Sequence, residues 1–90
     1  MNKEKRLKIY STAIEKYGSE AQKEMLYEEC GELITAVARF KRGRTTKKDI
    51  ITELADVSIM IEQLALILDY KKFEKEKDRK IIRLEKKLNE

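Results

Sequence analysis

Glu28-Glu29-Cys30-Gly31-Glu32 and Glu53-Leu54-Ala55-Asp56 are the two segments from which the fold of this 90-residue chain can be worked out. At about 100° per residue of an α-helix, the face around Glu29 gathers apolar residues within roughly 80°: Met25, Leu26, Leu33, Ala36, Val37 and Phe40. Glu32 lies at the edge of this face, about 60° from Glu29. The acids of the first segment therefore point with the apolar side chains, not away from them.

The second segment repeats this arrangement. Three apolar residues lie at roughly 20–80° from Asp56 around the helix: Met60, Leu64 and Ile67. Glu53 lies among them, at about 60°. A helix rarely carries acids on its apolar face, because an unpaired buried carboxylate is costly or takes up a proton. Two helices that both do so indicate a cation shared between them.

The composition favours helices and excludes several kinds of chemistry. Charged residues make up 42% of the chain and proline is absent, which is typical of long helices with charged surfaces. The absence of histidine excludes zinc sites built on histidine and Ser-His-Asp hydrolysis. A single cysteine excludes an intramolecular disulfide framework.

The sequence also bears on where the protein acts. No apolar run approaches the ~20 residues of a membrane span, so no membrane association is expected. The first residues are followed by no apolar segment of the signal-peptide kind. We therefore expect a cytoplasmic protein.

Apolar spacing predicts four helices, at about residues 3–17, 19–42, 46–69 and 71–89. Gly18 and Gly43 are expected to end the first two. Ser19 with Gln22, and Thr46 with Asp49, fit capping boxes that open the second and third. The predicted fold is one all-α domain over residues 1–90, an antiparallel bundle of about four helices.

So small a bundle exposes much apolar surface, which self-association would hide. Residues 71–90 form a charged C-terminal helix with a short apolar stripe of Ile81, Leu84 and Leu88. This stripe is expected to pack on the bundle or on a partner subunit.

The net charge of +4 is concentrated in one place. From Arg39 to Lys48 there are six basic residues and no acid, which makes a local attractor for phosphate. Lys41, Arg42 and Arg44 are the candidate phosphate-binding residues. Alternatively, these charges complement the C-terminal dipole of the preceding helix.

The four helical carboxylates predict the kind of metal. Residues three apart on a helix are neighbours, so Glu29 with Glu32 and Glu53 with Asp56 form two pairs on facing helices. All-oxygen, anionic ligands suit Mg²⁺ or Mn²⁺ rather than zinc or copper. Mg²⁺ commonly takes substrate phosphate oxygens in its open positions, so such a site awaits a phosphorylated ligand.

The pattern Glu-Glu-x-x-Glu followed by Glu-x-x-Asp resembles the MazG-type all-α nucleoside triphosphate pyrophosphohydrolases, over about residues 20–70, and the compact chain looks like the small phage or prophage members. The resemblance implies Mg²⁺-dependent hydrolysis of a (deoxy)nucleoside triphosphate to the monophosphate and pyrophosphate. It also implies that Glu29, Glu32, Glu53 and Asp56 bind the metal. Dimers or tetramers are the rule in that family.

A carboxylate not fully used by the metal can orient or deprotonate the attacking water, and Glu28 and Glu32 are the candidate catalytic residues. Glu28 lies about 100° from Glu29 and is equally well explained as a surface acid. One alternative function is a small basic helical nucleic-acid-binding or adaptor protein, but it leaves the core-facing acids unexplained. Another is an inactive relative with a structural metal site. No residue that reads the base can be assigned.

Overall fold

The computed structural model describes residues 1–90 and contains four helices and no strand. The helices are α1 (Lys3–Tyr17), α2 (Ser19–Lys41), α3 (Lys47–Leu68) and α4 (Tyr70–Leu88). The predicted all-α class is confirmed, and the helix bounds agree with the sequence to within a residue or so. None of the four combines the length and the apolar composition that a membrane crossing requires.

The turns between the helices follow the predicted chemistry with one exception. Gly18 and Gly43 have φ of 91° and 72°, values that glycine adopts easily. Thr46 and Asp49 form the predicted capping box at the start of α3. The capping box predicted for Ser19 and Gln22 is wrong, because Gly18 caps α2 and no side chain bonds to the helix end there.

Gln22 is instead buried between the two longest helices. Its side-chain amide donates a hydrogen bond of 2.5 Å to the carbonyl oxygen of Gln63. Gln22 is 9% exposed and Gln63 is 4% exposed. This pair joins α2 to α3 in the interior, where an amide without a partner would be costly.

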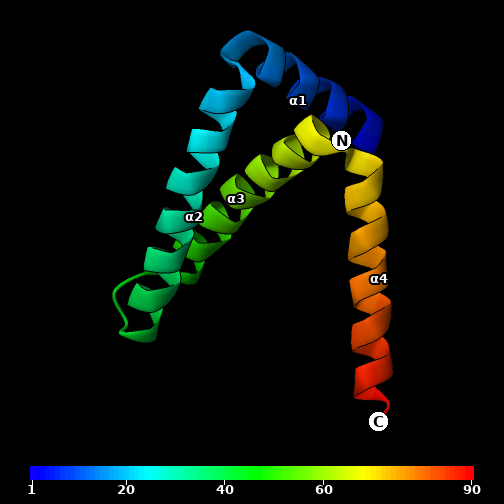
Figure 1. Ribbon diagram of the computed structural model, residues 1–90. Helices are drawn as coiled ribbons and strands as arrows, with labels where there is room; N and C mark the ends of the chain where they lie inside the picture. Colours follow the sequence, from blue (N-terminus) through cyan, green and yellow to red (C-terminus); the bar gives the residue numbers. More distant parts are fainter.

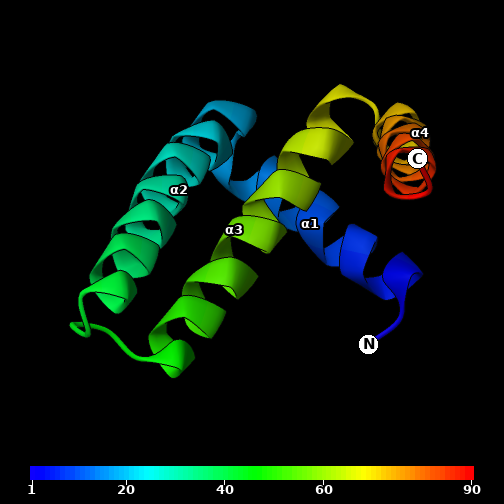
Figure 2. The same cartoon turned by 90° about the horizontal axis from the view of Figure 1, so that it is seen from below.

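The pair α2–α3 is an antiparallel hairpin that forms the body of the protein (Figure 1). Helix α1 crosses this hairpin at the end remote from the connecting loop, as Figure 2 shows from below. Helix α4 comes close to the rest of the fold only at its first turns and then diverges from α3 (Figure 1). The C-terminus therefore lies far from the other three helices.

The core is thin. No large side chain is fully enclosed. Only six residues are buried: Tyr10, Gln22, Ala36, Val57, Gln63 and Ala65. Val37 and Phe40, which lie on the apolar face of α2, are 50% and 46% exposed. Part of the apolar face that the sequence assigns to the interior is thus only half-covered.

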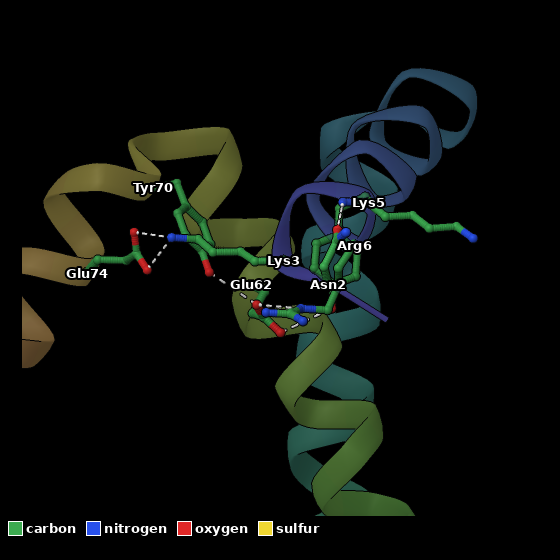
Figure 3. Close-up of polar contacts among 8 residues, drawn as sticks. Asn2, Lys3, Lys5, Arg6, Glu62, Tyr70 and Glu74 are labelled. Carbon is green, nitrogen blue, oxygen red and sulfur yellow. Dashed lines mark hydrogen bonds and ion pairs between the residues drawn. The ribbon is translucent and has the colours of Figure 1, made fainter.

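A polar cluster fixes where α4 leaves the body (Figure 3). The Glu62 carboxylate on α3 accepts hydrogen bonds from the hydroxyl of Tyr10 at 3.1 Å and from that of Tyr70 at 3.2 Å. The Arg6 Nε also donates to Glu62, at 3.4 Å. Lys3 pairs with Glu74 at 2.7 Å, which ties the start of α1 to the second turn of α4.

Changes at the buried amide pair are expected to be strongly non-additive. Gln22→Met alone should destabilise the protein by about 1–3 kcal/mol, because it leaves the Gln63 amide buried without a partner. Gln22→Met with Gln63→Met should recover most of that loss, since both polar groups are then removed. Urea midpoints of the two single variants and the double variant measure the coupling. Additive losses would show that the two amides do not depend on each other.

Candidate metal centre

The α2–α3 hairpin brings the two acidic segments together. Glu29 on α2 and Glu53 and Asp56 on α3 each offer a carboxylate oxygen within 4.8 Å of the others. Gln22 precedes Glu29 by seven residues, and Gln63 follows Asp56 by seven. The hydrogen-bonded amides and the acids therefore lie in the same register of the two antiparallel helices.

Two of these carboxylates have an oxygen that is buried and has no hydrogen-bond partner. The exposed area of Glu29 Oε2 and of Glu53 Oε2 is below 1 Å² each, and neither accepts a hydrogen bond. Buried polar atoms in proteins almost always have partners, so such orphans need an explanation. A cation between the helices would satisfy both, and the all-oxygen donor set fits a hard divalent ion.

The electrostatics of the cluster agree with this interpretation. Burial, followed by the neighbouring charges of Glu32, Asp56 and Glu53, raises the pKa of Glu29 above its ordinary 4.5. Burial and then Glu32 raise the pKa of Glu53 in the same direction. Because the carboxylates repel one another, the cluster attracts either protons or a cation.

The remaining two predicted acids are placed differently. Glu32 is exposed, but it lies close enough to raise the pKa of both Glu29 and Glu53. Glu28 is also exposed and lies outside the three-residue cluster. Both line an open groove of about 740 Å³, which Glu53 also lines. Cys30, beside them in sequence, is half-buried and unpaired.

This groove extends from the acids to the loop between α2 and α3. Its basic residues are Arg39 and Arg44, and it is otherwise lined by small or polar side chains that include Thr35, Thr45 and Thr52. Of the three basic residues predicted to bind phosphate, only Arg44 lines the groove; Lys41 and Arg42 do not. Arg39 was not among the predicted site residues.

The conformation of the loop between α2 and α3 explains which basic residues line the groove. The backbone N–H of Arg44 bonds to the carbonyl of Arg39 at 2.8 Å, and the Thr45 hydroxyl bonds to the carbonyl of Ala36 at 2.8 Å. With Gly43 at positive φ, these bonds turn the chain back along α2. Arg39 follows Glu32 by seven residues, and this spacing was a signal in the sequence for a shared face.

Asp49 also lines the groove, but its carboxylate is used in the capping box at the start of α3. Its side chain accepts from the Thr46 backbone N–H at 3.1 Å, and that bond and the Thr46 hydroxyl lower its pKa. This confirms that Asp49 is a helix cap.

Fold and site together define an all-α protein with a carboxylate cluster between two antiparallel helices and a partly basic groove beside it. The MazG nucleotide pyrophosphohydrolase domain matches residues 17–87, so the chain belongs to the MazG family. No curated protein and no solved structure matches this chain.

Proposed function

We propose that this protein hydrolyses nucleoside triphosphates to the monophosphate and pyrophosphate with the help of Mg²⁺, for which Mn²⁺ can substitute. The observation that carries the proposal is the pair of buried, unpartnered oxygens of Glu29 and Glu53, together with a groove that is lined by Glu53 and by two arginines. Membership of the family supports nucleotide pyrophosphohydrolase activity. A divalent ion would give the unpartnered acid oxygens a ligand, and a chain of phosphates would pair with the two arginines.

Glu29, Glu53 and Asp56 would hold the metal, with Glu32 completing the set from the groove side. When bound, Mg²⁺ neutralises charge on the triphosphate and lowers the pKa of a coordinated water. Glu32 can accept a proton from, or orient, a water beside the cluster, because it borders both the acids and the groove. Glu28, which lines the same groove, is the second candidate for this role.

Arg39 and Arg44 would bind the phosphates remote from the acids. Guanidinium groups pair bidentately with phosphate oxygens and stay charged at any working pH. Such contacts would also stabilise the negative charge that builds up on the departing pyrophosphate. Lys41 and Arg42, which do not line the groove, would contribute only to long-range attraction.

The direct test incubates the 90-residue protein with a panel of ribo- and deoxynucleoside triphosphates and Mg²⁺, and identifies the products. Release of pyrophosphate and monophosphate supports the proposal and ranks the bases and sugars. Release of inorganic phosphate and a nucleoside diphosphate would contradict the proposal, because it would mean that the bond to the terminal phosphate is cleaved. Absence of turnover, together with salt-sensitive binding of nucleic acid, would favour the nucleic-acid-binding alternative.

Arg39→Ala with Arg44→Ala is expected to raise KM for the triphosphate roughly tenfold or more, because two charge-assisted phosphate contacts are lost. The matched control is Lys41→Ala with Arg42→Ala, which removes the same charge from outside the groove. That control should change KM only slightly and mainly at low salt. Steady-state kinetics at two salt concentrations compare the pairs. Equal effects would mean that the basic run acts only as a diffuse field.

A further inference from the structure

A glycine lies well inside α2, beside the acids of the candidate metal centre. Glycine is the least favourable helix residue after proline, so Gly31 at this position calls for a reason. Its backbone supplies none, because only Gly18 and Gly43 have a positive φ. Any residue other than proline could therefore adopt the backbone conformation of Gly31.

Packing within the chain supplies no reason either. A Cβ atom added at Gly31 would meet no atom within 4 Å, apart from its chain neighbours and the adjoining turns of its own helix. A glycine also serves where the backbone must come close to a ligand. The room over Gly31 is open, and no other element of this chain uses it.

The facing helix carries the same kind of segment with an alanine in place of the glycine. Gly31 follows Glu29 by two residues, and Ala55 follows Glu53 by two. Gly31 lines the groove beside the acids, whereas Ala55 is exposed and does not line it. The smaller residue is therefore found at the position that borders the groove.

Gly31 lies along α2 between the acids and the arginines. One face of this helix lines the groove, through residues three and four apart: Glu28, Gly31, Glu32, Thr35, Ala36 and Arg39. Gly31 is two residues beyond Glu29, and Arg39 lies about 12 Å farther along the helix axis. A ligand that contacts both the metal cluster and Arg39 would thus pass over the α2 backbone near Gly31.

The threonines of the groove are held against the backbone. Their three hydroxyls donate to carbonyl oxygens: Thr35 to Gly31 at 2.9 Å, Thr45 to Ala36 at 2.8 Å and Thr52 to Lys48 at 3.1 Å. The side-chain donors left for phosphate are then the guanidinium groups of Arg39 and Arg44. What the groove offers at Gly31 is space and not a hydrogen bond.

We propose that Gly31 gives the triphosphate room to lie against the α2 backbone between the acids and the arginines, a role that rests on the proposed function and adds a positioning residue to it. A side chain at this position obstructs the substrate. Alanine and leucine are better helix formers than glycine. The same substitutions should therefore stabilise the protein and weaken its binding of substrate.

Gly31→Ala and Gly31→Leu test the proposal, with Ala55→Leu as the matched control. KM for the triphosphate that the parent hydrolyses fastest should rise about fivefold in Gly31→Ala and about fiftyfold or more in Gly31→Leu, since the substrate must yield to the added atoms. Calorimetry with inorganic tripolyphosphate and Mg²⁺ should show affinity falling in the same order. Both quantities should match the parent in Ala55→Leu, because Ala55 lies outside the groove.

Thermal unfolding in EDTA gives a readout that needs neither substrate nor metal. Gly31→Ala should raise Tm by roughly 3–8 °C. A lower Tm would overturn the proposal, because it would show that the fold itself requires glycine here. The variants should also sediment like the parent. A changed mass for Gly31→Leu would mean that Gly31 makes room for another chain, and the proposal would be wrong.

The role of Gly31 and the proposed function can fail separately. Unchanged KM and tripolyphosphate affinity in Gly31→Leu, with a parent that hydrolyses triphosphates, would overturn the role of Gly31 alone. A parent that binds tripolyphosphate more tightly than Gly31→Leu does, yet releases no pyrophosphate, would contradict the hydrolysis and support the role of Gly31. A parent that neither binds tripolyphosphate nor hydrolyses triphosphates would overturn both.

Discussion

Replacement of Glu53 by glutamine is expected to lower the rate of triphosphate hydrolysis by about 10²–10³-fold at saturating Mg²⁺. The substitution keeps the size of the side chain and removes one negative charge from a cluster whose oxygens lie within 4.8 Å of one another. Glu29→Gln should have a similar effect from the facing helix. In both variants the loss should appear chiefly in kcat, because the phosphate contacts proposed for Arg39 and Arg44 would be unchanged.

Pyrophosphate release at several Mg²⁺ concentrations is the measurement. Glu24→Gln serves as the matched control. Glu24 is an exposed acid of α2, the helix that carries Glu29, and lies outside both the cluster and the groove. Its rate should equal that of the parent. Near-normal rates for both Glu29→Gln and Glu53→Gln would refute the proposed metal site.

In EDTA the protein is expected to lose stability as the pH rises above about 4.5, and Mg²⁺ is expected to restore it. Burial and mutual repulsion raise the pKa values of Glu29 and Glu53 in the folded state. The folded state therefore binds more protons than the unfolded state. The stabilisation is complete below the unfolded value near 4.5 and is lost as the pH passes through the raised values.

On the proposed function, Mg²⁺ would bind only the assembled cluster appreciably, and an ion present at a hundred times its Kd should raise Tm by roughly 10 °C or more near neutral pH. Glu29→Gln should be more stable than the parent in EDTA, because it removes repulsion, and should gain less from Mg²⁺. Thermal unfolding at a fixed protein concentration, with and without the metal, gives both quantities. A parent that gains nothing from Mg²⁺, with a variant destabilised in EDTA, would contradict this account of the carboxylates.

The helices and the acidic cluster could be predicted because they depend on one number, the angle per residue. That angle places Glu29 and Asp56 on the apolar faces of their helices, and the loop is too short for anything but an antiparallel hairpin. The capping box at Thr46 is similarly local, since its two bonds join residues three apart. In contrast, Gln22 has a partner 41 residues away, and the same short pattern that suggests a cap conceals a core contact.

The basic side of the groove and the course of α4 depend on geometry that periodicity does not contain. Gly43 and the bonds of Arg44 and Thr45 decide which basic side chains line the groove, so charge density alone could not show that Arg39 lines it and that Lys41 and Arg42 do not. The stripe of α4 was visible in the sequence. Its divergence from α3 was not, because a stripe defines a face and not the surface that the face meets.

The shared register of the buried amides and the acids limits where the chain can change in length. A single residue inserted between Gln22 and Glu29 would turn the carboxylate by about 100° relative to the amide. Either the amide would then lose its bond to Gln63 or the carboxylate would leave the cluster with Glu53 and Asp56. Seven residues inserted in both helices would restore the alignment, to within about 20°. The turn at Arg42–Thr46 lies outside the helical segments that carry the amide pair and the acidic cluster. Insertions and deletions among relatives should therefore accumulate in that turn, while the spacing from Gln22 to Glu29 stays constant.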